Sequence, residues 1–285
     1  MSKNNFSREE LNTFIDNALH EDVRDGDHTS NACIPVEALG RAQLLIKESG
    51  MLAGVELAEL IFERVDPKLD ITILRNDGEE VSFGTIAFYV EGSTRSILKA
   101  ERLVLNCMQR MSGIATLTSE FVKMLEGTKA KVIDTRKTTP GFRLIEKWAI
   151  KIGGGTNHRM GLYDMIMIKD NHIEFCEGID KAIESVRTYL KTNKLKLKVV
   201  IEAKNIEEAK EIIAVGGIDR IMLDNFSPTD VQRTVEMIDG KFETEASGGI
   251  TLDGIKQYGE TGVDYISVGA LTHSAPNFDL SLKAY

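Results

Sequence analysis

The second half of the chain repeats one pattern, in which a short apolar or β-branched run is followed by a stretch with helical spacing. The runs lie at 132–134, 165–168, 199–202, 221–224, 242–247 and 265–268, and the last four recur about every 22 residues. That spacing fits one strand, one helix and two turns. Strands that alternate with helices pair in parallel, so the pattern predicts a parallel sheet or an α/β barrel from about Lys131 onward.

Polar residues at the ends of these runs favour the barrel. They are Asp134 to Lys137, Lys169 to His172, Glu202, Lys204, Asp224, Asn225, Ser247 to Gly249, and Gly269. Barrel enzymes carry their active sites on the rim formed by the carboxyl ends of the strands. An open doubly wound sheet often has a G-x-G-x-x-G motif after its first strand, whereas Gly153–Gly155 follow a helical pattern. Only six or seven strands are found, so we expect fewer than eight barrel units.

The first part of the chain carries both helix and strand patterns. Ser7 and Glu10 form a capping-box pattern that predicts a helix, and residues 21–30 are then expected to be a loop. Strands are expected on both sides of a helix at 55–65, with a turn at Asn76–Gly78. A long helix is predicted from Ser96 to about Leu125, with core positions at Leu98, Leu103, Leu105, Met108 and Met111.

Composition narrows the possible partners. The formal net charge of −9 over 285 residues disfavours binding to nucleic acid or to anionic lipid. Cys33, Cys107 and Cys176 are odd in number and far apart, which favours a reducing compartment. The N-terminus has no apolar signal core, and no run reaches the length of a membrane span. We expect a soluble, cytoplasmic protein.

One stretch departs from the acidic balance. Residues 131–169 contain eight Lys or Arg against three Asp or Glu, a local excess of five positive charges. Arg136, Lys137 and Lys169 fall at expected strand ends. A basic rim in an acidic protein favours a small anion held in a cleft over a merely solvated surface.

Glycines follow the last two strands. Ser247-Gly248-Gly249 and Val268-Gly269-Ala270 lie one repeat apart. Glycines at strand ends let backbone N–H groups approach a phosphate, although each motif alone also fits simple turn chemistry. The pair therefore indicates a phosphate site.

Carboxylates and histidines complete the candidate site. Glu202 and Asp224 end adjacent strands and could bind ribose hydroxyls, hold Mg²⁺ or stabilise a cation; the alternative is a salt bridge to a strand-end lysine. His158 and Arg159 could bind a carboxylate, or His158 could cap a helix. For His172 a structural hydrogen bond is as plausible as a substrate contact. Zinc-ligand spacing is absent from the sequence, and the methionines, including Met167, are interpreted as core.

Several segments, in order along the chain, resemble the quinolinate phosphoribosyltransferase family. They are GDHTS, GMLAG, ERLVLNCMQRMSGIAT, DTRKTTPGFRLIEKWAIKIGGGTNHRMGLYDMIMIKDNH, VVIEAKN, IMLDNFSP, EASGGI and ISVGALTHSA. The resemblance covers nearly the whole chain. It implies an N-terminal α/β sandwich domain at 1–112, joined by the tail 273–285, and a partly open, seven-stranded α/β barrel at 113–272.

The resemblance also implies the roles of individual residues. The carboxylates of quinolinate would be held by Arg102, Arg136, His158 and Arg159. The expected catalytic residues are Lys137 and Lys169, at the junction of quinolinate and its co-substrate, and Glu202 and Asp224, on the side of the ribose and the metal. The remaining expected contacts are Thr135, Ser247, Gly248, Gly249, Val268, Gly269, Ala270, His273 and Lys47 of a partner subunit. Lysine at that last position, often arginine in relatives, would bind an anion as a point charge rather than bidentately.

The implied reaction joins quinolinate to 5-phosphoribosyl 1-pyrophosphate. Its products would be nicotinate mononucleotide, pyrophosphate and CO₂, in a step of de novo NAD synthesis. Mg²⁺ would arrive with the pyrophosphate and lie near Glu202 and Asp224, without tight protein ligands. A homo-oligomer, most simply a dimer, is implied, with no nucleic acid or membrane partner.

Three other interpretations stay open at this point. One is a relative on the same scaffold that is associated with molybdenum transport; intact Arg102, Arg136, His158 and Arg159 favour quinolinate instead. A Schiff-base aldolase would use Lys169 or Lys204, which end strands. A non-enzymatic binding scaffold would give no reason for charges to converge on one rim.

Overall fold

The chain forms two compact units in the computed structural model, which describes residues 6–285. Unit 1 comprises the N-terminal part through Ser119, Thr139–Gly154 and Ala275–Tyr285. Unit 2 comprises Glu120–Thr138 and Gly155–Ser274. Within the described residues, no helix is both long enough and apolar enough to cross a bilayer.

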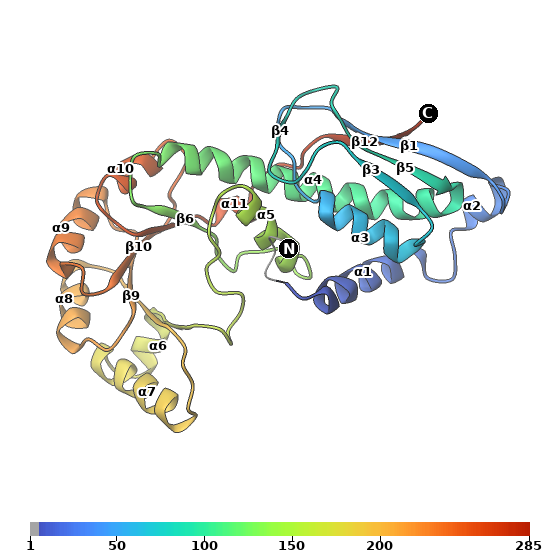
Figure 1. Cartoon of the computed structure of the whole chain (residues 1–285). Helices are drawn as coiled ribbons and strands as arrows, with labels where there is room; N and C mark the ends of the chain where they lie inside the picture. The colour runs from blue at the N-terminus through green and yellow to red at the C-terminus, as the bar shows by residue number, and fades with distance from the viewer. Residues whose placement is uncertain (1–5) are drawn as a thin grey trace. The chain divides into compact units, whose positions relative to one another are not determined.

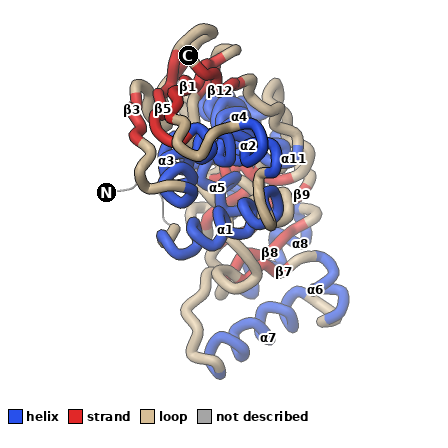
Figure 2. The backbone as a smooth tube through the Cα atoms, turned by 90° about the vertical axis from the view of Figure 1, so that its right-hand side faces the viewer, coloured by secondary structure: helices blue, strands red, loops and turns tan. Residues whose placement is uncertain are grey.

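Unit 1 is built on an antiparallel sheet with the strand order β12-β1-β5-β3. Its strands are β1 (Leu39–Ile46), β3 (Asp70–Ile73), β5 (Ile86–Ser93) and β12 (Leu280–Ala284), and β2 (Gly50–Met51) pairs with β4 (Glu80–Val81). The helices are α1 (Arg8–Val23), α2 (His28–Cys33), α3 (Val55–Val65), α5 (Arg143–Ile152) and most of α4 (Thr94–Met124). Figures 1 and 2 show α3 and α4 on one face of the sheet.

Most expected elements of unit 1 are confirmed, and two expectations are wrong. Ser7 caps α1, accepting from the Glu10 N–H while the Glu10 side chain accepts from the Ser7 N–H. The expected loop at 21–30 is shorter, covering only 24–27 between the end of α1 and the start of α2, because the Asp27 carboxylate accepts from the Ser30 N–H and caps the short helix α2. Leu98 is 40% exposed, so it is not a core position.

The end of the chain packs against the middle of α4. β12 pairs with β1 over Ala42–Ile46, and Phe278 N–H donates to the carbonyl of Gln109. Any side chain at Gly113 would collide with the carbonyl of Pro276. Glycine at that position therefore permits the tail to lie directly on the helix.

Unit 2 is the predicted α/β barrel. Its parallel sheet has the order β6-β11-β10-β9-β8-β7. The strands are β6 (Lys131–Ile133), β7 (Ile166–Ile168), β8 (Val199–Ala203), β9 (Arg220–Asp224), β10 (Glu243–Ser247) and β11 (Tyr265–Ser267), which correspond to the six runs found in the sequence. The helices are α6 (Asp170–Phe175), α7 (Ile179–Thr192), α8 (Ile206–Val215), α9 (Pro228–Ile238), α10 (Ile255–Gly259) and α11 (Ala270–His273). Figure 1 shows α8, α9 and α10 outside the strands.

The seventh strand is reduced to a single contact. Thr156 makes an isolated parallel bridge to Ile133 of β6, on the side away from β11. β6 and β7 are the two ends of the sheet order, so the barrel is open between them. All five residues of β8 are buried, as expected for a strand covered on both faces.

Candidate active site

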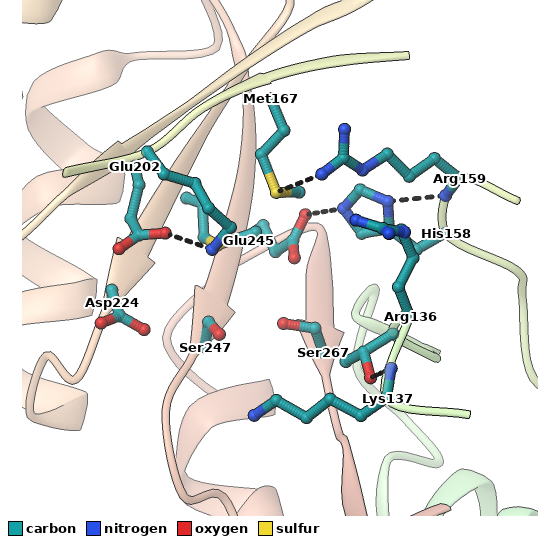
Figure 3. Close-up of a pocket in the computed structure, with 13 residues that line it drawn as sticks. Arg136, Lys137, His158, Arg159, Met167, Glu202, Asp224, Glu245, Ser247 and Ser267 are labelled. Atoms are coloured by element: carbon teal, nitrogen blue, oxygen red, sulfur yellow. Dashed lines mark hydrogen bonds and ion pairs between the residues drawn. The ribbon is translucent and has the colours of Figure 1, made fainter. Parts of the chain in front are cut away.

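A cavity of about 360 Å³ lies at the carboxyl ends of the unit 2 strands, as the rim argument predicted. Figure 3 shows its side chains converging from the strands and the loops that follow them. The lining residues are Thr135, Arg136, Lys137, His158, Arg159, Met167, Lys169, Glu202, Met222, Asp224, Glu245, Ser247 and Ser267.

Two cations follow β6 directly. Arg136 and Lys137 are both exposed, and the Lys137 N–H donates to the Thr135 hydroxyl oxygen at 3.0 Å. The Thr272 hydroxyl, which is buried, donates to the Lys137 carbonyl at 2.8 Å. This bond ties the cationic loop to the loop after β11, so that both sit at the same end of the barrel.

Arg159 is held inside the cavity wall. It is 8% exposed, and its guanidinium donates to the Met165 carbonyl at 3.1 Å and contacts the Met167 sulfur at 3.6 Å. Burial lowers the pKa of Arg159, and the positive charge of Arg136 lowers it further. A buried cation that is repelled by a second cation at the rim creates a site that an anion would stabilise.

The side chains of His158 and Glu245 meet in a buried contact beneath these cations. The His158 Nε2 lies 3.3 Å from the Glu245 Oε2, and the His158 Nδ1 accepts from the Arg159 N–H at 2.7 Å. The His158 N–H donates to the buried Asp134 carboxylate at 2.8 Å. Glu245 also accepts from Arg220 Nη1 at 2.9 Å, and the Arg220 guanidinium stacks 3.8 Å above the Tyr265 ring. The side chain of His158 therefore contacts protein groups and does not cap a helix.

The opposite wall carries two carboxylates. Lys169 Nζ lies 2.8 Å from Glu202 Oε2, which is the salt bridge considered above as the alternative for Glu202. Asp224 is half-buried and accepts from the Asn225 side-chain amide at 2.7 Å. The His172 Nδ1 accepts from the Lys169 N–H at 2.9 Å, so His172 orders the start of α6.

The expected phosphate loops lie beside the cavity. Gly248 has φ of +105° and its hydrogen faces Asn225 so closely that a side chain would collide with that residue. Gly249 has φ of +59° and open space where a side chain would be. A side chain at Gly269 would meet both Lys137 and His273 at 3.1–3.2 Å. Gly248 and Gly249 therefore adopt left-handed backbone conformations that favour glycine, whereas at Gly269 a side chain would require Lys137 and His273 to shift by a few tenths of an ångström.

Not every expected site residue lines the cavity. Arg102 is exposed on α4 and Lys47 is half-buried after β1, and both belong to unit 1. The other expected residues that do not line the cavity lie in the loops after β10 and β11 or in α11 and are Gly248, Gly249, Val268, Gly269, Ala270 and His273.

A metal carried by a phosphate substrate would fit the carboxylate wall. Within residues 6–285 there is no cluster of three or more His, Cys, Asp or Glu side chains arranged for a metal ion. Glu202 and Asp224 nevertheless present oxygen atoms from neighbouring strands, the donors that Mg²⁺ prefers. Two carboxylates are the usual protein share for Mg²⁺ that is bound mainly by substrate phosphates.

Sequence reasoning missed the lower layer of the cavity. Met222 and Glu245 lie two residues before the expected site residues Asp224 and Ser247 on the same strands, and Met167 and Ser267 lie two residues before Lys169 and Gly269, which stand just past the ends of β7 and β11. Side chains two apart on a strand point to the same face, so this periodicity could have found all four. The interpretation of Met167 as core is wrong, because it lines the cavity and contacts Arg159.

Comparison with known protein families gives two matches that together cover most of the chain. The model described as quinolinate phosphoribosyl transferase, N-terminal domain, matches residues 27–112, and the corresponding C-terminal domain matches residues 114–283.

Individual relatives agree with these matches. A Nicotiana tabacum protein named quinolinate phosphoribosyltransferase (decarboxylating) 2b, mitochondrial, is 48% identical over 93% of this chain and 80% of its own length. A Bacillus subtilis protein named probable nicotinate-nucleotide pyrophosphorylase (carboxylating) is 39% identical over 96% and 93%. The crystal structure of NadC from Streptococcus pyogenes matches with a TM-score of 0.92 at 36% identity, covering 99% of this chain and 98% of that one.

Proposed function

This chain belongs to the quinolinate phosphoribosyltransferase family, and we propose that the cavity of unit 2 is where it performs the family's reaction. The protein is a pentosyltransferase. It moves a phosphoribosyl group from 5-phosphoribosyl 1-pyrophosphate to quinolinate, with decarboxylation, in NAD biosynthesis. The observation that supports this location best is the pair of converging guanidinium groups, Arg136 and Arg159, on one wall of the cavity.

Quinolinate fits those cations because it is a dianion. Each carboxylate can accept two parallel N–H bonds from one guanidinium. A bound carboxylate would also relieve the repulsion between Arg136 and Arg159, which adds to the binding free energy. His158 holds the Arg159 N–H and so supports this wall from behind.

The phosphoribosyl donor fits the opposite wall. Its ribose hydroxyls and its Mg²⁺ would meet Glu202 and Asp224, while the glycine loops after β10 and β11 would receive its phosphates. Lys169 is paired with Glu202 and would exchange this partner for a phosphate or carboxylate oxygen when substrates bind.

The proposed chemistry needs positioning more than acid–base catalysis. The lone pair of the pyridine nitrogen forms a bond to the anomeric carbon as the carbon–oxygen bond to pyrophosphate breaks and its electron pair leaves with pyrophosphate. The ring then carries a positive charge. The bond from ring carbon 2 to its carboxylate can break with the electron pair kept on carbon 2, CO₂ leaves, and carbon 2 takes a proton from solvent. Fixed charges that hold two anions together supply the rate enhancement.

Arg102 and Lys47 of unit 1 would reach a cavity through the assembly of two subunits. We propose a homodimer in which each cavity is completed by basic residues of the partner subunit. The support is chemical: the barrel is open between β6 and β7, and an anion held at an exposed mouth is weakly stabilised until water is excluded.

We also propose a cytoplasmic location. Cys33, Cys107 and Cys176 are all free thiols, which suits a reducing compartment. Plant relatives are named as mitochondrial or chloroplastic, so cell fractionation with an antibody against this chain is the test. Recovery in an organelle fraction would contradict the proposal.

The function itself is tested with purified protein. Incubation with quinolinate, 5-phosphoribosyl 1-pyrophosphate and MgCl₂ should yield nicotinate mononucleotide and pyrophosphate in equal amounts. Chromatography with ultraviolet detection measures the nucleotide. Omission of either substrate is the control, and failure of the complete mixture to form product would refute the function.

A further inference from the structure

Glu245 is a buried carboxylate in a cavity that otherwise suits anions. It lies in the middle of β10, is 0% exposed, and lines the cavity together with Arg136 and Arg159. Both of its side-chain partners, Arg220 at 2.9 Å and His158 at 3.3 Å, contact the same oxygen, Oε2. The other oxygen, Oε1, is buried and has no hydrogen-bond partner among the described residues. Figure 3 shows the carboxylate pointing toward the centre of the cavity.

The Glu245 carboxylate is ionised. Burial by itself would raise the pKa of Glu245, but hydrogen bonds and charge from His158 and Arg220 outweigh that effect and hold the pKa below its usual value. An unpaired oxygen on a buried anion is costly to folding, so its retention points to a ligand interaction.

The other two carboxylates of the cavity are differently placed. Glu202 is paired with Lys169, and Asp224 is half-buried and bonded to Asn225. Glu245 alone among the three combines full burial with an unpartnered oxygen. A fixed negative charge there opposes binding of a dianion, so any benefit must appear later in the reaction.

The reaction supplies such a benefit when the ring nitrogen is alkylated. Its lone pair becomes the bond to the anomeric carbon, the displaced electron pair leaves on pyrophosphate, and the ring changes from neutral to cationic. We infer that Glu245 is a catalytic residue whose Oε1 stabilises the positive charge of the pyridinium ring as it forms. This inference rests on the proposed function and assigns a role to a residue outside the expected site.

The first test compares Glu245→Gln with Glu243→Gln. Both residues pair with Arg220 from the same strand, but Glu243 does not line the cavity, so its variant controls for the lost Arg220 contact. Glu245→Gln should lower kcat on the order of a hundredfold, the usual cost of removing one preorganised electrostatic group. Its KM for quinolinate should stay equal or fall, because a repulsive charge is gone. Glu243→Gln should keep both constants near wild type.

The second test uses probes of ring charge and needs no turnover. 1-Methylpyridinium-3-carboxylate and 3-methylbenzoate have the same shape and differ by one positive charge in the ring. Calorimetry should show that wild type and Glu243→Gln prefer the cationic probe by on the order of tenfold or more, and that Glu245→Gln loses this preference. If Glu245→Gln does not fold, the preference of the wild-type protein for the cationic probe decides the test alone.

Three results would overturn the inference: no cationic preference in wild type, an unchanged preference in folded Glu245→Gln, or a variant that weakens quinolinate binding and kcat together. The last is the signature of a merely structural residue. A wild-type protein that forms no nicotinate mononucleotide would instead refute the proposed function, so the two failures are distinguishable.

Discussion

At the scale of single residues, the cavity is organised by charge and by depth. The cations Arg136 and Lys137 are exposed at the rim, whereas Arg159 and Glu245 are buried below them. Exposed side chains can be replaced without disturbing the barrel, whereas replacing a buried charged one also leaves its partners unpaired. Variants of the rim therefore report on binding most cleanly.

Arg136→Ala should impair quinolinate binding and leave the fold intact. A charge-assisted hydrogen bond contributes about 1.5–3 kcal/mol, so we expect KM for quinolinate to rise on the order of tenfold to a hundredfold. Steady-state kinetics measure KM, and circular dichroism with thermal melting checks the fold. Arg233→Ala removes an exposed arginine of α9 and is the matched control. Unfolding at ordinary temperature, or an unchanged KM, would count against the assignment.

Nicotinate should be a poor substrate compared with quinolinate. It lacks one carboxylate, so a site with Arg136 and Arg159 would keep a guanidinium unpaired, which should lower kcat/KM by several powers of ten on general grounds. Competition between the two acids in one reaction, followed by product analysis, measures the ratio. Comparable specificity constants would contradict a two-carboxylate site.

The upper layer of the cavity could be predicted from sequence because strand-end residues meet at one rim. Lys169, Glu202 and Asp224 were placed in this way, and all line the cavity. The buried contacts could not be predicted, because the pairing of Glu245 with both Arg220 and His158 depends on which strands are neighbours. That order is a property of the folded sheet.

At the scale of elements, helices with a strong apolar stripe were predicted to within two residues. Helix α3 was expected at 55–65 and α4 from Ser96 to about Leu125, and the structure has Val55–Val65 and Thr94–Met124. Short elements were not predictable. The helix α2 exists because of one cap at Asp27, and the seventh barrel strand is one bridge at Thr156, so neither leaves a periodic signal.

The N-terminus of α3 makes one pH-dependent contribution to stability. The Asp77 carboxylate accepts from the Val55 N–H at 2.7 Å, yet burial raises the pKa of Asp77 to about 6. The folded state therefore holds this proton more tightly than the unfolded state. The protonated Asp77 side chain therefore stabilises the folded state by about 3 kcal/mol below about pH 4. This stabilisation is lost as the pH rises through 6.

Asp77→Asn should remove most of this dependence of the free energy of unfolding on pH. Urea midpoints measured between pH 4 and pH 7 should fall with pH in the wild type and fall much less in the variant. Asp70→Asn, on the exposed side of β3, is the control and should follow the wild type. A variant with the wild-type slope would show that Asp77 does not titrate in this range.

At the scale of the whole molecule, the proposed dimer makes the activity depend on two chains. Lys47 and Arg102 belong to unit 1, and the cavity is lined entirely by unit 2. A mixing experiment tests whether unit 1 of one chain serves the cavity of another.

Lys47→Glu and Lys169→Ala should each be inactive alone and complement each other when mixed. In a heterodimer with shared sites, one site carries both lesions and the other carries none. Mixing under exchange conditions should restore up to about half the activity of one normal dimer in each heterodimer. If each chain uses its own Lys47, mixing restores nothing, and a fully active monomer would also exclude sharing.

The pairing of β12 with β1 has a consequence for how the protein is made. The central strand β1 emerges early from the ribosome, but the strand that covers its other edge includes residues 280–284, more than two hundred residues later. Unit 1 therefore cannot complete its sheet while the barrel is being synthesised, and the edge of β1 stays open to pairing with other nascent chains throughout that time. A cell that makes this protein must protect that edge, so demand for a chaperone should depend on translation speed across the barrel rather than on the stability of the finished fold.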